Sequence, residues 1–247
     1  MSWYLVEVSA RAASPCLLAG WSGSFAYRAL LELVRRAAEP KGRIYAHPLY
    51  VGGRPLLSGV DGSAAALEPG RRFSLKAVMS EHDLRLLLAA AGGDKVLRST
   101  CEAELEEIKF EALPEALGDG HGLASAKLEF SPTAFMFHGR DVLYPSPQRM
   151  AYSLAKTYKE LYGRDLKQLA DRAPTALEVV YMAVRPVKVN IGESRAVPAF
   201  VGRAELAIYG NVEAWLTLLK LGEAVGVGIS RAIGLGKYRI LEVKRLA

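Results

Sequence analysis

Residues 3–8, WYLVEV, are rich in aromatic and β-branched side chains, with polar Glu7 between Val6 and Val8, which predicts a strand with one buried face. The pattern then changes to a helical period, which predicts a helix over Ser24–Ala38 with Ser24 as its N-cap. The same reasoning predicts strands over 43–51, 56–60 and 71–79, a helix from Ser80 to Ala91, and one or two strands over 96–110. This order, β-α-β-β-α-β, is typical of a ferredoxin-like domain.

The pattern starts again after a stretch rich in glycine and proline, residues 113–122. The predicted elements are a strand over 124–137, a hairpin tip at 138–141, a helix from 146 or 147 to 162, two strands over 176–190 and 194–209 joined at 191–193, a helix from 211, and a last strand over 237–243. We therefore predict an α+β chain with two tandem ferredoxin-like domains, residues 1–115 and 122–247. The repeat is one of architecture rather than of residues.

Composition narrows the class of protein. Hydrophobic residues make up 51% and charged residues 23% of the 247 residues, a globular balance, and no run of 18 apolar residues predicts a membrane span. The chain opens directly on a strand pattern, so we expect no signal peptide. Cys16 and Cys101 are far apart and fit no metal-ligand spacing, which favours reduced thiols and a cytoplasmic location. A net charge of +6 suggests an anionic partner.

A glycine-rich segment, 226–237, follows the last predicted helix and precedes the last strand. A dinucleotide-binding turn has the opposite order, strand then helix, and its third glycine is replaced here by Arg231. A Walker A pattern ending at Gly236-Lys237 would also need glycine at position 231. The segment instead suits the approach of backbone N–H groups and two cations to an extended polyanion.

The string GVGISRAIGLGKYRI resembles the C-terminal glycine-rich signature of the RAMP superfamily of CRISPR-associated proteins, most closely its repeat-RNA-processing endoribonucleases. The resemblance implies two ferredoxin-like domains and a nuclease that cleaves precursor crRNA at the CRISPR repeat. It implies no metal or other cofactor, because the ribose 2′-hydroxyl attacks its own phosphate and leaves a 2′,3′-cyclic phosphate and a 5′-hydroxyl. The implied partners are the repeat RNA, other effector subunits and, as in some relatives, a second copy of the chain.

This reaction needs a base, an acid and a cation near the phosphate. The family's catalytic histidine commonly falls at or just after the first helix, which assigns the role to His47, with His138 as the strongest rival. The resemblance makes Tyr27 on that helix a supporting residue, and Arg54 and Lys41 the available cations. Arginine is a poor proton donor, so the identity of the general acid stays open.

RNA contacts are expected from small and basic residues of the glycine-rich segment and of the hairpin before it. The predicted contact residues are Gly226, Gly228, Ser230, Arg231, Gly234, Gly236, Lys237, Arg195 and Arg203. Two other functions fit less fully: a non-catalytic RAMP subunit that binds crRNA in an effector complex, and an unrelated enzyme that holds a small phosphate ligand at the glycine-rich segment.

Overall fold

The computed structural model describes residues 2–98, 101–192 and 195–246. The chain divides into two compact units. The first unit contains Met1–Leu113, Lys188–Val197 and Ala232–Gly234, and the second contains Pro114–Val187, Pro198–Arg231 and Leu235–Ala247. Two short segments from the second half of the sequence, the hairpin end 188–197 and the tripeptide 232–234, thus belong to the first unit.

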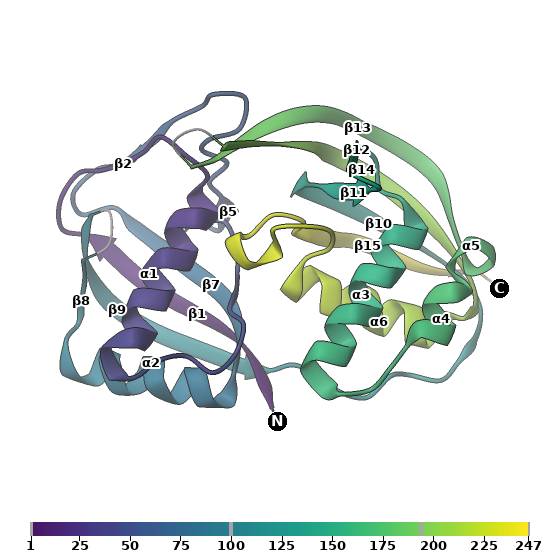
Figure 1. Cartoon of the computed structure of the whole chain (residues 1–247), viewed down its shortest axis with the longest axis horizontal. Coiled ribbons are helices and arrows are strands. Elements are labelled where there is room, and N and C mark those ends of the chain that lie inside the picture. The colour runs from purple at the N-terminus through teal and green to yellow at the C-terminus, as the bar shows by residue number, and fades with distance from the viewer. Residues whose placement is uncertain (1, 99–100, 193–194, 247) are drawn as a thin grey trace. The chain divides into compact units, whose positions relative to one another are not determined.

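The first unit is a sheet with two helices on one face (Figure 1). Its strands run in the order β5-β4-β7-β1-β9-β8, with β3 also paired to β7. The elements are β1 (Trp3–Ala12), β2 (Cys16–Leu18), α1 (Ser22–Ala37), β3 (Tyr45–Ala46), β4 (Tyr50–Val51), β5 (Arg54–Pro55), β6 (Ala65–Leu67), β7 (Arg72–Ser80), α2 (Glu81–Gly93), β8 (Val96–Arg98) and β9 (Glu102–Ala112). The central strands β7, β1 and β9 pair antiparallel, as a β-α-β-β-α-β unit requires.

Helix α1 packs its apolar face on this sheet, with Leu30 and Val34 fully buried. It begins at Ser22, two residues before the predicted start, so the prediction of Ser24 as N-cap is wrong. Trp21 holds the cap position without a side-chain cap, and the Ser22 hydroxyl donates to the backbone oxygen of Leu56. Helix α2 starts close to the predicted position, and Ser80 is its N-cap, because the Ser80 hydroxyl accepts the N–H of Asp83 at 3.2 Å.

The two cysteines form a disulfide, contrary to the expected reduced thiols. Cys16 opens β2 and Cys101 comes just before β9, with Cα atoms 5.2 Å apart. Both side chains are buried beside the core under α1. Their separation of 85 residues in sequence gave no sign of this contact, which depends on how the β2 and β9 ends meet in space.

The second unit also contains an antiparallel sheet, with the strand order β13-β14-β10-β15. Its elements are β10 (His121–Thr133), β11 (Phe135–Phe137), β12 (Arg140–Val142), α3 (Pro147–Tyr162), α4 (Lys167–Asp171), α5 (Ala173–Ala176), β13 (Leu177–Gly192), β14 (Arg195–Asn211), α6 (Val212–Val225) and β15 (Tyr238–Leu246). Helices α4 and α5 were not predicted. The predicted turn at 191–193 and strand start at 194 include Glu193 and Ser194, which lie outside the described residues.

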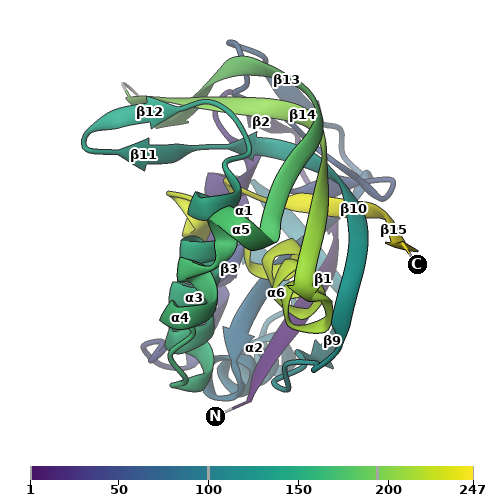
Figure 2. The same ribbon diagram turned by 90° about the vertical axis from the view of Figure 1, so that its right-hand side faces the viewer.

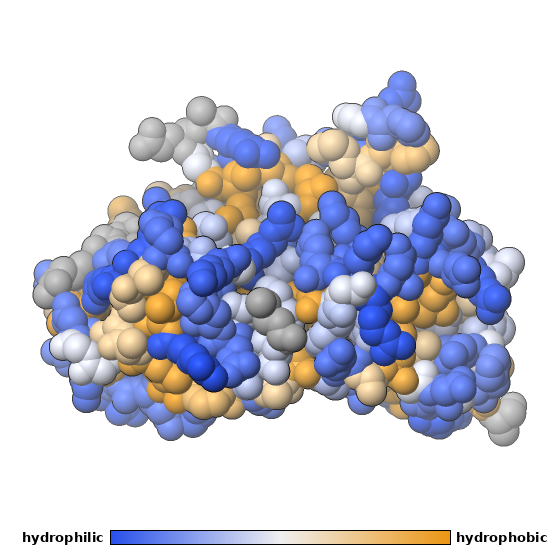
Figure 3. All heavy atoms as spheres, turned by 60° about the horizontal axis from the view of Figure 1, so that its bottom comes forward, coloured by the Kyte–Doolittle hydropathy of each residue, from blue (hydrophilic) through white to orange (hydrophobic). Residues whose placement is uncertain are grey.

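Within the second unit, β11 and β12 form a small hairpin beside the start of α3 (Figure 2). The hairpin tip at His138-Gly139 and the end of α3 at Gly163, with a left-handed φ of 72°, agree with the sequence pattern. Figure 3 shows a face on which polar residues cover most of the surface, with smaller apolar groups between them. In the described part of the chain, no helix is long and apolar enough to cross a bilayer.

Candidate active site and RNA interface

His47 follows β3 directly, and its backbone fixes it beside β7. Its N–H donates to the carbonyl oxygen of Lys76 at 2.8 Å. The side chain is 6% exposed, and its ring centroid lies 6.3 Å from that of Tyr50 at the start of β4. The Lys76 ammonium lies 5.1 Å from the centre of the Tyr50 ring. The His47 side chain is therefore buried next to Tyr50, whose ring also contacts the Lys76 ammonium.

The glycine-rich segment folds into a tight loop that has no room for side chains at its closing points. Gly226 ends α6, and the loop is closed by a hydrogen bond of 2.9 Å from the Val227 N–H to the Gly236 oxygen. Gly236 has φ +78°, and a Cβ there would lie 1.8 Å from the Val227 oxygen. Glycine is required at this position by both conformation and space.

The tripeptide 232–234 of this loop contacts two parts of the first unit, the start of α1 and His47. The Trp21 indole N–H donates to the Ile233 oxygen at 2.6 Å. A Cβ on Gly234 would lie 2.9 Å from the carbonyl carbon of His47. The loop therefore supports the backbone at His47, a relationship that the sequence did not reveal.

The two cations of the loop are buried rather than presented to solvent. Arg231 is 8% exposed, donates to the Thr157 hydroxyl and lies 3.9 Å from a carboxylate oxygen of Glu160. Lys237 is 2% exposed, and its ammonium donates to the Ala224 oxygen at 2.6 Å. Burial, together with nearby Arg231, lowers the pKa of Lys237 well below its ordinary value. These contacts argue against the predicted phosphate contacts and indicate that both cations hold the loop to α3 and α6.

A cavity of about 650 Å³ in the first unit has the charge expected for an RNA-binding site. Tyr27 and Arg28 of α1 line it together with Arg195 of β14. Trp21, Ser24 and Asn190 supply further polar or aromatic atoms, and no carboxylate is among the lining residues. Arg28 and Asn190 were missed, although Arg28 adjoins Tyr27 in sequence on an exposed helical position.

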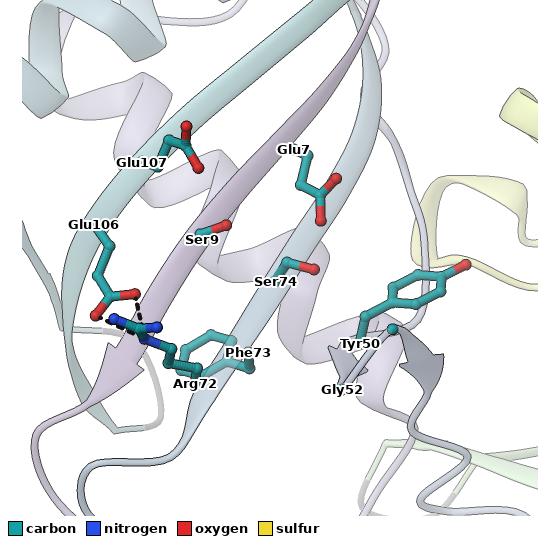
Figure 4. A pocket seen from close by; sticks show the side chains of 10 residues that line it. Glu7, Ser9, Tyr50, Gly52, Arg72, Phe73, Ser74, Glu106 and Glu107 are labelled. Atoms are coloured by element: carbon teal, nitrogen blue, oxygen red, sulfur yellow. Dashed lines mark hydrogen bonds and ion pairs between the residues drawn. The ribbon is translucent and has the colours of Figure 1, made fainter.

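A second cavity of the first unit, about 790 Å³, lies on the sheet face away from α1 (Figure 4). Glu7, Glu106 and Glu107 line it, and Arg72 pairs with Glu106 at 3.0 Å. Burial raises the pKa of Glu7, but hydrogen bonds from Lys76 and Ser74 outweigh it and keep the pKa below its ordinary value. Three carboxylates oppose the approach of a polyanion, so this cavity suits RNA less well.

Among the other predicted site residues, Lys41, Arg54 and Arg203 are exposed. The backbone N–H of Lys41 donates to Asp83 at 2.9 Å, and Arg54 opens β5 in the short β4–β5 hairpin. Arg203 of β14 is exposed and pairs with Glu129 at 2.7 Å, as does Arg239. Ser230 has a left-handed φ of 55° within the loop. In the described residues, no group of three or more His, Cys, Asp or Glu side chains is placed to hold a metal ion.

Comparison with known proteins identifies the fold. Residues 128–238 match a family model described as CRISPR-associated endoribonuclease Cas6. A Cas6 (TTHB231) product complex matches with a TM-score of 0.70 at 19% identity, covering 97% of this chain and 99% of that one. The chain has the Cas6 fold. The predicted α+β class with tandem ferredoxin-like domains is thereby confirmed. The predicted resemblance to CRISPR repeat-RNA-processing endoribonucleases agrees with the family model, which matches less than half of the chain.

Two further Cas6 structures give the same result. Thermus thermophilus Cas6 (TTHB231) matches with a TM-score of 0.66 at 17% identity, covering 98% of this chain and 99% of that one. A Cas6 (TTHA0078) product complex matches with a TM-score of 0.63 at 17% identity, covering 96% and 100%. At such identities the likeness is one of fold. A search of curated proteins by sequence finds no match.

Proposed function

We propose that the chain is an endoribonuclease that binds CRISPR repeat RNA and cleaves precursor crRNA without a metal ion. The observation that supports it most is the placement of His47 directly after β3, against the backbone of the loop that carries the family signature. The match of residues 128–238 to the Cas6 family and the fold shared with Cas6 product complexes support the same substrate class.

The proposed step is attack of a ribose 2′-hydroxyl on the adjacent phosphorus. The 2′-hydroxyl gives its proton to a base as the new O2′–P bond forms the 2′,3′-cyclic phosphate. The P–O5′ bond breaks, and the 5′-oxygen takes up a proton and leaves as a hydroxyl. His47 moves a proton in this exchange, because an imidazole has both protonation states available near neutral pH. Tyr27 is the proposed supporting hydroxyl, with Lys41 and Arg54 as candidate cations.

The RNA strand is proposed to pass along the cavity lined by Tyr27, Arg28 and Arg195. Two arginines and no carboxylate line this cavity, so phosphate groups are attracted there and binding falls as salt rises. We infer that Arg28, which the sequence did not single out, contributes to phosphate binding beside Arg195. Contact with other effector subunits and self-association stay predictions.

The alternative, a non-catalytic RAMP subunit, is favoured by one observation. His47 is only 6% exposed, whereas a catalytic group must reach the substrate. The two functions therefore differ in whether RNA binding exposes the imidazole to a scissile phosphate. Both require repeat RNA to bind, and only the nuclease requires cleavage.

The test is incubation of the protein with CRISPR repeat RNA from the same genome in excess EDTA. Wild-type protein is expected to cut at one position, and His47→Ala to bind with similar affinity but to cut about 10²- to 10⁴-fold more slowly. His138→Ala is the matched control, since it removes the rival imidazole from an exposed hairpin tip. Tight binding without any cutting by the wild-type protein would favour the non-catalytic subunit instead.

A further inference from the structure

A cavity of about 470 Å³ in the second unit lies outside the site proposed above. It is bounded by the β11–β12 hairpin, the start of α3 and the first half of the glycine-rich loop. Its lining consists of Phe135, Met136, Phe137, Gln148, Arg149, Tyr152, Ser153, Lys156, Gly228, Ile229 and Arg231. None of these residues is acidic.

The walls of this cavity expose aromatic surface. Phe137 is 52% exposed and Tyr152 is 42% exposed. Arg149 and the His138 ring, whose centroid is 4.3 Å away, cover part of the Phe137 ring, and the remaining surface is open to a ligand with a flat face. The adjacent Met136, 50% exposed, adds a flexible apolar contact.

The aromatic surface is combined with positive charge. The Arg149 guanidinium lies 4.2 Å from the Phe137 ring centre and donates to the Met136 oxygen at 3.3 Å, which holds the hairpin against α3. Lys156 lies two turns further along the same helix and also lines the cavity. The first turn of α3 has no acidic residue, and Ser146 does not cap it with its side chain, so this helix start adds to the positive potential.

Asp171, which lies next to the cavity, is hydrogen-bonded to one of the lining residues. Asp171 of α4 accepts a hydrogen bond from the Tyr152 hydroxyl, which fixes the edge of that ring. The Ser153 hydroxyl accepts the N–H of Gly228 at 2.9 Å and so ties α3 to the glycine-rich loop. Side-chain hydrogen bonds of α3 thus link it to the hairpin, to α4 and to the glycine-rich loop.

We propose that this cavity binds one unpaired nucleotide of the RNA, outside the cleavage site. Its base stacks on Phe137 or Tyr152, its phosphate contacts Arg149 and Lys156, and the Gln148 amide offers a donor and an acceptor to the base edge. An aromatic face beside cations, without a carboxylate, is the combination that single-stranded nucleic acid requires. The inference rests on the proposed function, since it presumes that repeat RNA is the ligand.

The test uses repeat RNA blocked by a 2′-deoxy residue at the cut site and labelled with 2-aminopurine at one position at a time. Stacking on an aromatic ring changes the fluorescence of the labelled position that occupies the cavity. Phe137→Ala is expected to abolish that change and to weaken binding about 5- to 150-fold. Phe137→Trp is expected to restore both. Arg149→Ala should lower the salt dependence of log Kd by about 0.7.

Matched controls remove the same groups elsewhere. Phe110→Ala deletes a ring that is 51% exposed on β9, and Arg164→Ala deletes an exposed cation after α3. If the wild-type protein binds and cuts the repeat but no labelled position responds to Phe137→Ala, the nucleotide site is wrong and the nuclease assignment stands. If the wild-type protein neither binds nor cuts the repeat, both proposals fail.

Discussion

The backbone of Gly234 lies against the backbone of His47, so that a Cβ on the glycine would sit 2.9 Å from the histidine carbonyl carbon. It would also sit 3.0 Å from the Pro48 nitrogen. Both neighbours are main-chain atoms, which cannot turn aside as a flexible side chain can. The loop therefore sets the position of the proposed catalytic residue through contacts that only glycine allows.

Replacement of Gly234 by alanine is expected to displace His47 and to slow cleavage about 100-fold, because small displacements of a catalytic group are costly. Gly70→Ala is the matched control: Gly70 has the same φ of +81°, but a Cβ there would meet nothing within 4 Å. Both variants bear the strain of a left-handed alanine, about 1–2 kcal/mol. Single-turnover cleavage rates that fall equally in the two variants would contradict the proposed contact.

The arginines of the predicted interface should separate into those that bind RNA and those that stabilise the fold. Arg195 is exposed and lines the cavity beside Tyr27, so Arg195→Ala should lower the salt dependence of log Kd for RNA by about 0.7 to 0.9. Arg231 is buried against Thr157, so Arg231→Ala should lower the free energy of unfolding by about 1–3 kcal/mol. Its effect on the salt dependence should be small. Binding titrations at several salt concentrations measure the salt dependence, and denaturant melts of each variant measure the free energy of unfolding. A lower salt dependence in Arg231→Ala, with a loss of stability in Arg195→Ala, would refute the assignment.

Hydrophobic periodicity predicted the long strands and helices of both halves, because these elements are amphipathic and end at clear turn residues. It missed the short elements β2, β6, α4 and α5, which have too few residues to show a period. The end of α3 at Gly163 and the cap of α2 at Ser80 follow local rules, which a sequence contains in full. The start of α1 was missed, because it involves a hydrogen bond from the Ser22 hydroxyl to the backbone oxygen of Leu56, which is distant in the sequence.

The site was harder to predict than the fold. A sequence shows that Arg231 and Lys237 are cations, but it does not show that α3 and α6 bury them. It also does not show that Arg195 and Tyr27, distant in the chain, line one cavity. Both facts depend on long-range packing. The pairing of Cys16 with Cys101 was missed for the same reason.

Loss of the disulfide should destabilise the protein without affecting catalysis. The bond closes a loop of 85 residues, for which chain entropy gives about 4–5 kcal/mol, with typical measured values of about 2–5 kcal/mol. A reducing agent should lower the midpoint of denaturant unfolding of the wild-type protein. The Cys16→Ala/Cys101→Ala double variant should start at the lower midpoint and not respond. An identical response of both proteins to reductant would show that the bond does not contribute.

Lys237 should make stability depend on pH. Burial lowers its pKa in the folded protein, so between that lowered pKa and the ordinary value of 10.5 the unfolded chain binds more protons than the folded one. Its contribution to the free energy of unfolding therefore rises with pH across this window. The Lys237→Met variant should lose this rise, which denaturant melts at a series of alkaline pH values would detect. A parallel pH profile in both proteins would mean that Lys237 stays charged when folded.

The most direct test of the central claim is the chemistry of the cleaved ends. Repeat RNA cut by the wild-type protein in excess EDTA should carry a 2′,3′-cyclic phosphate and a 5′-hydroxyl, as mass spectrometry of the fragments can show. One 2′-deoxy residue at the cut site should abolish cutting and leave binding intact. A 3′-hydroxyl with a 5′-phosphate, or cutting of the 2′-deoxy substrate at the same position, would contradict the proposed 2′-hydroxyl attack.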